Sequence, residues 1–195
     1  MVYKLENIEM IKLSEAYQKV LYWFFSFPEA ETGLNDLSSN LEISKTTAKK
    51  IINMFVEEGF LIKKIYGKTW RITCNKNHIY NFTKKVAFNL EMVYGIYGKG
   101  MREDILKHAN NPKSVILFGS YRKGDDTEKS DVDIAVEIAG NEEIKIIQLG
   151  IISLFGYRQN ISVNIHIFSR NKIDINLFSN IANGIVLEGF LEVRP

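Results

Sequence analysis

The segment SVILFGSYRKGDDTEKSDVDIAVE, residues 114–137, constrains the fold more than any other stretch of this chain. Its first five residues are apolar and rich in β-branched side chains, and Gly119 closes the run. This pattern predicts a core strand that ends in a turn with an unhindered backbone. A helix that begins after Ser120 would aim free N–H groups and the positive end of its dipole at the turn. The turn is therefore suited to approach a phosphate.

Two carboxylates open the next predicted strand. Ten residues separate Ser120 from Asp131, and Asp133 follows two positions later. Side chains two apart in a strand project from one face, so the two carboxylates are expected to lie together. Adjacent carboxylates repel each other unless a cation joins them, and Mg²⁺ is the candidate because it takes one or two carboxylates plus substrate phosphates. Glu137 has the same parity but lies about 13 Å beyond Asp133, too far to share one ion.

Together these residues resemble the signature of the minimal nucleotidyltransferases of the polymerase-beta-like superfamily, over residues 101–195. The resemblance implies a mixed sheet backed by helices and an NTP bound through Mg²⁺. It makes Asp131 and Asp133 the catalytic carboxylates that hold the metal. The residues expected at the nucleotide are Gly119, Ser120, Lys123 and Ser130. A surface turn followed by a charged strand start is the alternative interpretation.

This superfamily usually places a third acidic residue on a neighbouring strand. The matching segment is ISVNIHIF, residues 161–168, where Asn164 occupies that position. An amide can coordinate a cation but brings no charge and cannot act as a base, so Asn164 weakens the case for catalysis more than that for nucleotide binding. His166 shares its strand face and is either a substitute ligand or base, or a strand residue with a satisfied imidazole.

Residues 1–77 have a different character. The sequence predicts a first helix over residues 13–27, a second over 34–41 and a third after Ser44, a candidate N-cap. Gly59 ends the third helix, after which FLIKKIY and TWRITC predict two strands joined by a tight turn. This is the order of a winged helix-turn-helix. The expected fold class is therefore α+β, with an N-terminal winged helix-turn-helix domain followed by a mixed-sheet nucleotidyltransferase domain.

A DNA-binding surface is predicted on this first domain. The second helix of a helix-turn-helix pair enters the DNA major groove in known cases. The residues expected to meet DNA are Thr46, Lys49, Lys50, Asn53 and, from the hairpin, Lys68. Acidic residues are scarce from residue 44 to residue 76, so positive charge is locally enriched. A protein-docking module with solvated lysines is the alternative.

Residues 78–100 are expected to form a connector helix and a hinge. Apolar residues recur in this segment at roughly heptad spacing, namely Ile79, Phe82, Val86 and Val93. Asn89 interrupts the stripe. The pattern predicts a helix that packs on a partner, and a homodimer is the hypothesis that follows. Three glycines then predict the hinge, at Gly95, Gly98 and Gly100.

The remaining segments give further expectations. Residues 141–155 are expected to be a helix and residues 175–182 a short helix. The aromatic residues of the first helix exceed what one stripe can bury, so some are expected to meet another domain or subunit. No apolar stretch approaches transmembrane length and the start lacks a signal-peptide core, which predicts a cytoplasmic protein without membrane contact. The net charge of +2 excludes no class of function.

Two functions emerge from these observations. The first is a Mg²⁺-dependent enzyme that moves an NMP from an NTP to a hydroxyl of a protein or nucleic acid, with DNA binding by the first domain. The arrangement resembles a group of small prokaryotic proteins, and similar minimal transferases are antitoxins that nucleotidylate a toxin protein. The second is a DNA-binding transcriptional regulator whose transferase domain only binds nucleotide, which Asn164 favours.

Overall fold

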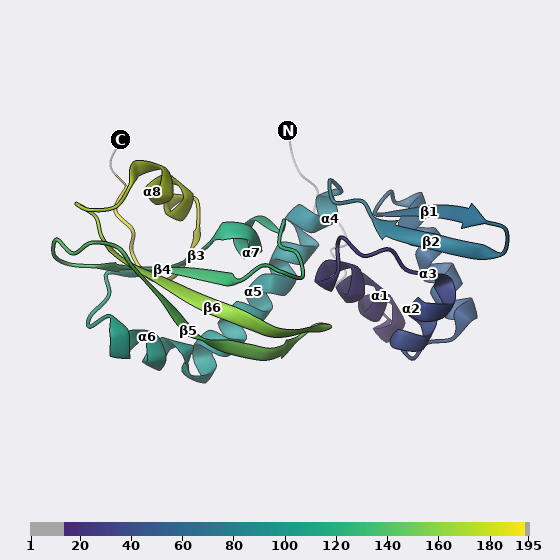
Figure 1. Cartoon of the computed structure of the whole chain (residues 1–195), viewed down its shortest axis with the longest axis horizontal. Coiled ribbons are helices and arrows are strands. Elements are labelled where there is room, and N and C mark those ends of the chain that lie inside the picture. Colours follow the sequence, from purple (N-terminus) through teal and green to yellow (C-terminus); the bar gives the residue numbers. More distant parts are fainter. Residues whose placement is uncertain (1–13, 194–195) are drawn as a thin grey trace, which may run out of the picture.

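The computed structural model describes residues 14–193 as two parts joined by a helical connector (Figure 1). Within residues 14–74, three helices precede an antiparallel hairpin, in the order that the sequence predicted. Their bounds are α1 (Glu15–Ser26), α2 (Leu34–Asn40), α3 (Lys45–Glu57), β1 (Leu61–Tyr66) and β2 (Thr69–Cys74). The hydroxyl oxygens of Ser14 and Ser44 accept hydrogen bonds from the first turns of α1 and α3, as N-caps do.

An aromatic core holds these helices to the hairpin. Phe24 of α1, Phe55 of α3 and Phe60 before β1 are fully buried, and Phe60 contacts each of the other two rings edge to face. The loop after α1 adds a backbone pairing, because Thr32 and Ile72 exchange hydrogen bonds 3.0 and 2.9 Å long. The loop is thereby fixed beside β2.

The connector consists of α4 (Ile79–Phe82) and α5 (Lys84–Ile96), and its buried face differs from the predicted one. Ile79 and Phe82 are exposed, whereas the inward residues of α5 are Lys85, Asn89, Met92 and Val93. The predicted apolar stripe is observed in part, because Val93 is buried and Val86 is half-buried. The polar residues Lys85 and Asn89 also occupy inward positions, where they bind a loop of the second part. The helix also does not break at Gly95. It continues into the π-helical turn η1 (Tyr97–Met101), which leaves helical geometry at Lys99 and Gly100 before α6 (Arg102–His108).

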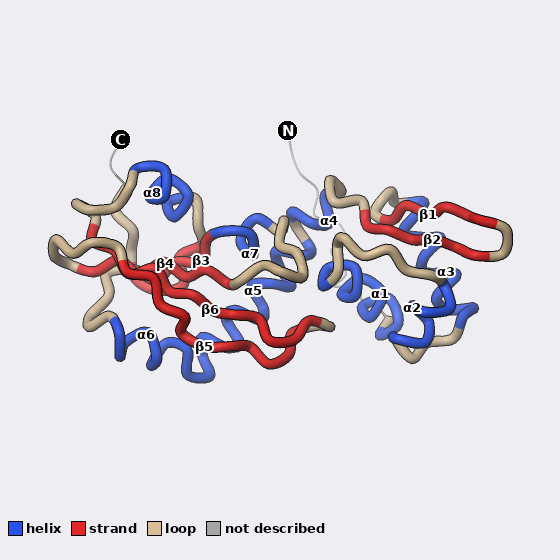
Figure 2. The backbone as a smooth tube through the Cα atoms, in the orientation of Figure 1, coloured by secondary structure: helices blue, strands red, loops and turns tan. Residues whose placement is uncertain are grey.

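The second part is a mixed sheet with helices on both faces (Figure 2). Within the described residues, five strands run in the order β5-β6-β4-β3-β7, with β4 parallel to β6 and the other pairs antiparallel. Its elements are β3 (Ser114–Phe118), α7 (Gly119–Lys123), β4 (Val132–Ile138), β5 (Lys145–Phe155), β6 (Arg158–Ser169), α8 (Ile175–Ala182) and β7 (Ile185–Gly189). Val115 and Leu117 face the core beneath α5 and α6, whereas Ile116 and Phe118 face α8. The mixed α+β class that the sequence predicted is therefore observed.

The helix predicted over residues 141–155 is absent from the described residues, because β5 occupies that place. The segment contains several β-branched isoleucines, and Gly156 turns the chain (φ 57°) into a hairpin with β6. A register shift between Gln148 and Gly150 breaks the apolar and polar alternation along the strand. The sequence of this segment therefore does not show the two-residue alternation by which strands are recognised. The helix predicted over 175–182 matches α8.

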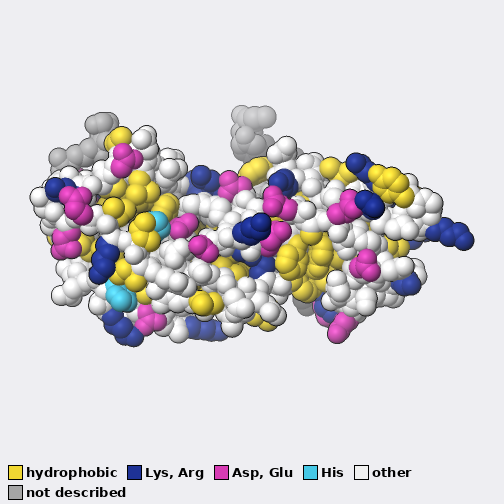
Figure 3. Space-filling model, viewed as in Figure 1, with side chains coloured by type: hydrophobic (Ala, Val, Ile, Leu, Met, Phe, Trp, Pro, Cys, Tyr) yellow, Lys and Arg dark blue, Asp and Glu magenta, His cyan; other side chains and the backbone are white. Residues whose placement is uncertain are grey.

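Aromatic stacking joins the two parts. The rings of Tyr22 in α1 and Phe88 in α5 stack with centroids 4.3 Å apart, and Phe88 stacks on Phe155 of β5 at 4.2 Å. Figure 3 shows hydrophobic side chains gathered between the two parts, while charged side chains of both signs are scattered over this face. The expectation that surplus aromatic residues of the first helix meet another part of the structure is confirmed. No helix of residues 14–193 has the length and apolarity to cross a membrane.

An ion pair fixes the edge strand β7 to the second part. The carboxylate of Glu188 accepts hydrogen bonds from Arg102 Nε at 2.6 Å, Arg102 Nη2 at 2.7 Å and the Tyr97 hydroxyl at 2.6 Å. The hydrogen bonds from Arg102 and then Tyr97 lower the pKa of Glu188 from 4.5 to about 2. The ionised carboxylate therefore stabilises the fold above about pH 4.5, and this contribution is lost as the pH falls through about 2.

We predict that Glu188→Gln lowers the free energy of unfolding at pH 7 by about 1 kcal/mol or less, because solvent screens this partly exposed pair. Urea unfolding of both proteins between pH 7 and pH 3 measures the effect. The difference is expected to stay constant from pH 7 to pH 5 and to shrink below the ordinary pKa of a glutamate. A difference that is equal at every pH contradicts the assignment.

Candidate active site

The turn after β3 brings Gly119 against a carboxylate of β4. Phe118 and Asp133 are paired residues of the two antiparallel strands. Gly119 has φ +72°, and a Cβ built on it would lie 2.9 Å from Asp133 Oδ2. Both the backbone conformation and the missing side chain therefore require glycine at this position. The turn and the carboxylate form one cradle, in which no side chain separates the backbone of Gly119 from Asp133.

The two carboxylates lie at the start of β4. Asp131 directly precedes the strand and is exposed, while the Asp133 side chain is 28% exposed. Between and beyond them, Val132 and Ile134 are fully buried in the core on the opposite face. The sequence prediction that both carboxylates share one face is consistent with this alternation.

Each carboxylate has a polar neighbour on β6. The parallel register pairs Asp133 with Asn164. The amide Nδ2 of Asn164 donates to Asp131 Oδ2 at 3.2 Å, and His166 Nε2 lies 3.1 Å from Asp133 Oδ1. Asn164, at the position where a third acidic residue was expected, therefore donates a hydrogen bond to Asp131.

One nitrogen of His166 is satisfied and the other is not. Nε2 faces Asp133, whereas Nδ1 is buried with no hydrogen-bond partner among the described residues. The ring lies edge-on to Phe118, with centroids 5.0 Å apart. With Nε2 carrying the proton, the unpaired atom is a lone pair, which costs less than a buried N–H without an acceptor. His166 then donates to Asp133 and fixes the rotation of that carboxylate.

These residues fit a magnesium ion only in combination with a substrate. Within residues 14–193, no group of three or more His, Cys, Asp or Glu side chains is close enough to hold a metal ion. Asp131 and Asp133 alone supply too few ligands for a metal cage. Mg²⁺ is commonly bound by one or two carboxylates, with phosphate oxygens and waters completing its octahedron. The donor set and the cradle at Gly119 suit that mode of binding.

The other residues predicted at the nucleotide have different surroundings. Ser120 is partly exposed, and its hydroxyl has no hydrogen-bond partner within residues 14–193, so it can donate to a phosphate. Lys123 is exposed in the last turn of α7, at the opposite end of that helix from Gly119. The Ser130 hydroxyl oxygen accepts from the backbone N–H of Thr127 at 2.9 Å. Ser130 therefore shapes the loop before Asp131 in addition to any contact with a nucleotide.

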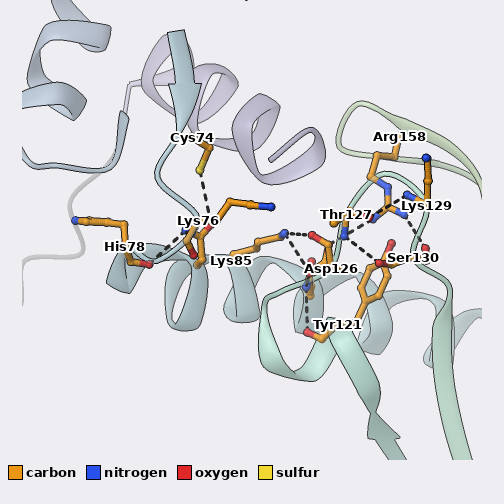
Figure 4. A network of polar contacts seen from close by, with 12 residues as sticks. Cys74, Lys76, His78, Lys85, Tyr121, Asp126, Thr127, Lys129, Ser130 and Arg158 are labelled. Carbon is orange, nitrogen blue, oxygen red and sulfur yellow. Dashed lines mark hydrogen bonds and ion pairs between the residues drawn. The ribbon is translucent and has the colours of Figure 1, made fainter. Parts of the chain in front are cut away.

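Sequence reasoning missed a buried charged cluster next to these residues (Figure 4). The side chains of Lys85, Asp126 and Arg158 are 1%, 2% and 5% exposed. Asp126 lies in the loop between α7 and β4, Lys85 in α5 and Arg158 at the start of β6. Lys85 and Asn89 are four residues apart and share the inward face of the connector, a spacing that the sequence did display.

Burial opposes both charges of the pair formed by Lys85 and Asp126. Desolvation raises the pKa of the Asp126 carboxyl and lowers the pKa of the Lys85 ammonium group, and each partner's charge counteracts the shift. The Lys85 Nζ lies 3.3 Å from Asp126 Oδ1, and Arg158 Nη1 lies 3.4 Å from Oδ2. Removal of Asp126 would leave two buried cations uncompensated, whereas removal of Lys85 would leave Asp126 paired with Arg158 alone.

The predicted DNA-contacting residues of α3 divide between two sides of that helix. Lys49 Nζ lies 5.9 Å from the ring centroid of Trp70 in β2, on the hairpin side. Asn53 lies on the same side, where its Oδ1 accepts from Lys63 Nζ at 2.6 Å. Thr46 and Lys50 instead line a pocket of about 480 Å³ between α1 and α3.

Lys68 lies at the tip of the hairpin, away from α3, and lines a smaller pocket beside the start of α2. Two other basic residues near the hairpin are neutralised, because Arg71 pairs with Glu31 at 3.1 Å and Lys76 with Glu29 at 3.0 Å. The exposed positive charge of this surface is therefore carried by lysines of α3 and the hairpin.

Comparisons with known proteins agree with the geometry of the second part. Residues 101–181 match the model of a family described as a nucleotidyltransferase domain. Two proteins of Methanocaldococcus jannaschii, each named "Putative protein adenylyltransferase", are 54% identical to short stretches of the chain. One match covers 37 residues, 19% of this chain and 37% of the relative, and the other 33 residues, 17% and 34%. The chain thus spans little more than a third of the length of either relative.

No solved structure matches the chain. The family model and the two relatives support a nucleotidyltransferase domain in the second part, and such a domain implies an NTP substrate.

We predict that Gly119→Ala abolishes measurable NTP binding and destabilises the fold by about 1–3 kcal/mol, because alanine is strained at positive φ and its Cβ meets Asp133. Calorimetric titration and thermal unfolding measure the two effects. Gly95→Ala is the matched control, since Gly95 lies in α5 with no atom within 4 Å of an added Cβ. Undiminished NTP affinity in Gly119→Ala would show that the turn does not contact the nucleotide.

Proposed function

We propose that this protein transfers an NMP from a Mg²⁺-bound NTP to a hydroxyl group of another macromolecule. The observation that carries the proposal is the close approach of the Gly119 turn to Asp133, which brings a turn suited to bind phosphate next to a carboxylate suited to bind a metal ion. The nucleotidyltransferase family match over residues 101–181 supports the same conclusion. In the proposed division, residues 1–77 form the first domain, 78–100 the connector and 101–195 the transferase domain.

Each residue of the site has a proposed role. The backbone N–H groups of the Gly119 turn and the Ser120 hydroxyl bind the triphosphate. Asp131 and Asp133 hold the ion, while Asn164 and His166 orient these carboxylates by hydrogen bonds. Bound Mg²⁺ would offset the negative charge that develops on the α-phosphate and on the leaving group.

The reaction forms a bond between the acceptor oxygen and the α-phosphorus. It breaks the bond between that phosphorus and the oxygen that bridges the α- and β-phosphates. Pyrophosphate leaves, and the acceptor proton passes to solvent, because no carboxylate of the described residues takes the third position. The names of the two Methanocaldococcus relatives favour ATP as donor and a protein hydroxyl as acceptor. A toxin partner is one such protein, and a nucleic-acid end is the other class of acceptor.

The first domain is proposed to be a winged helix-turn-helix that binds DNA. The α2–α3 pair, the hairpin and the pairing of Thr32 with Ile72 support the fold. The exposed lysines of α3 and the hairpin support a phosphate-binding surface. Thr46, Lys49 and Lys50 are the residues proposed to reach DNA, with Lys68 at a flanking phosphate. Asn53 enters this role only if DNA displaces Lys63 from its side chain. Homodimerisation through exposed residues of the connector stays a prediction.

A second function is favoured by one observation. The hydrogen bond from Asn164 to Asp131 places a neutral donor at the position where a third carboxylate was expected, so the described residues supply no base there for an acceptor. In this alternative the protein is a DNA-binding regulator, and its transferase domain binds NTP without turnover.

We predict that calorimetry detects NTP binding that depends on Mg²⁺ and is lost in the Asp131→Ala, Asp133→Ala double variant. Glu103→Ala, Glu142→Ala removes two exposed carboxylates of the same domain and serves as the control. Binding without Mg²⁺ dependence, or unchanged in the double variant, argues against the site. Transfer of label from α-labelled NTP by the wild type separates the two functions, because the regulator binds NTP without turnover. A gain of transfer in Asn164→Asp would show that the site is otherwise assembled.

A separate prediction concerns DNA. Lys49→Ala, Lys50→Ala should reduce the salt dependence of DNA binding by about one unit of log–log slope for each phosphate that a lysine no longer neutralises. Fluorescence anisotropy with labelled duplex DNA at salt concentrations from about 50 to about 200 mM measures that slope. Lys107→Ala, Lys172→Ala removes the same charge from the second part, where both lysines are paired with acids. Equal slopes for the wild type and both variants contradict DNA binding by α3.

A further inference from the structure

The loop that carries Asp131 has no regular secondary structure of its own. Residues 124–131 connect the end of α7 to the first residue of β4. A metal-binding carboxylate must be held in place for binding to be productive, and a loop of this kind does not do so alone. Hydrogen bonds between Thr127 and Ser130 shape the loop from within. The contacts that attach it to the rest of the structure come from α5 and β6, and most of them are buried.

The connector helix binds the middle of the loop. Lys85 Nζ donates to the backbone oxygen of Asp126 and lies 3.3 Å from Asp126 Oδ1. One turn further along, Asn89 Nδ2 donates to Asp126 Oδ1 at 2.8 Å and to the backbone oxygen of Tyr121 in α7 at 3.0 Å. Two side chains of α5 thus attach both the loop and the short helix after the Gly119 turn.

The sheet binds the end of the loop. Arg158 Nη1 lies 3.4 Å from Asp126 Oδ2, and Arg158 Nη2 donates to the backbone oxygen of Ser130 at 2.7 Å. Ser130 is the residue immediately before Asp131. Figure 4 shows Lys85 and Arg158 directed at Asp126 from opposite sides. The backbone next to the carboxylate is therefore fixed through one buried aspartate.

The connector also touches the start of the loop, and it is anchored in the first part of the structure. A Cβ on Gly124 (φ +82°) would lie 1.8 Å from the backbone oxygen of Asn81 in α4, so no side chain fits there. Asn81 Nδ2 in turn donates to the backbone oxygens of Asn75 at 3.0 Å and Lys76 at 3.2 Å, just after β2. The contacts run without a gap from the end of β2 to the residue before Asp131.

A buried cluster of this kind is a poor device for stability alone. Desolvation of the two charges offsets much of their attraction, and well-packed apolar residues often stabilise a fold as well or better. The charged cluster instead fixes the conformation of the loop, because Lys85, Asn89 and Arg158 each donate to a specific oxygen of the loop. Asp126 accepts from all three side chains.

We propose that Lys85, Asn89 and Arg158 are positioning residues that act through Asp126 to place Asp131 for metal and nucleotide binding. We call the contacts of these three residues with the loop the clamp. The functional consequence of the clamp rests on the proposed nucleotidyl transfer, but the clamp itself can be measured without it. Through the clamp, the connector becomes part of the proposed transferase site and links that site to the first part of the structure.

Lys85→Met tests the clamp, because methionine keeps much of the side-chain volume and removes the donor. Amide hydrogen exchange at residues 124–131 is expected to become faster, and the affinity for Mg²⁺ and NTP together is expected to fall by about tenfold to a hundredfold. Lys84→Met is the matched control. Lys84 is the preceding residue of α5, and its Nζ lies 3.5 Å from the centroid of the Tyr80 ring in α4 and donates to the Tyr17 hydroxyl of α1 at 3.4 Å, away from the loop.

A second variant separates positioning from stability. Lys85→Met leaves the Asp126 carboxylate without one of its two cations, so this variant is expected to lose thermal stability. Lys85→Met, Asp126→Asn, Arg158→Met removes all three buried charges together, so that none is left without a partner, and is expected to recover stability. Under the proposal, loop exchange stays fast and Mg²⁺-dependent NTP affinity stays low in the triple variant. Recovery of all three properties together would show that the cluster serves stability only.

The outcomes also distinguish the clamp from the function on which it rests. A wild-type protein that binds no NTP refutes the proposed function. The amide exchange rates of residues 124–131 in the wild type and in Lys85→Met then test the clamp on their own. Unchanged loop exchange in Lys85→Met overturns the clamp whatever the nucleotide result. Normal loop exchange in Lys84→Met, together with fast exchange in both Lys85 variants, supports it.

Discussion

The antiparallel pairing of β3 with β4 sets the geometry of the whole candidate site. It places the last residue of β3 opposite Asp133, so the turn that follows must pass directly over that carboxylate. Glycine is then required at position 119 for two independent reasons, its positive φ and the 2.9 Å approach of Asp133 Oδ2 to the place of a Cβ. The parallel pairing of β4 with β6 adds Asn164 and His166 beside the same carboxylates. The turn proposed to bind phosphate and the two carboxylates proposed to bind a cation are thus positioned by one sheet.

Elements outside the sheet hold the loop and the turn at this end of the strands. The connector helix places Lys85 and Asn89, where an amphipathic helix would have apolar residues, against the loop that leads to Asp131. Aromatic stacking through Phe88 then joins the connector to both α1 and β5. The first part of the structure is therefore packed against the second part through Phe88 of α5, and the same helix holds the loop of the candidate site through Lys85 and Asn89.

Much of this arrangement could be read from the sequence, for identifiable reasons. The strand, turn and carboxylate strand of residues 114–137 carry strong local signals, namely β-branched runs, a glycine and alternation. The N-terminal helices carry serine N-caps and a clear apolar face. The strand β5 was mistaken for a helix because its register shift removes the alternation by which strands are recognised. The partners of Asp126 were missed because they lie 41 and 32 residues away from it in the chain.

The most direct test of the account is a crystal structure of the protein with Mn²⁺ and a non-hydrolysable NTP analogue, with the metal located by anomalous scattering. The account predicts a metal peak at the carboxylates of Asp131 and Asp133, with the triphosphate against the backbone N–H groups of the Gly119 turn. A nucleotide bound elsewhere, or a triphosphate at the turn with no metal at these carboxylates, would contradict it.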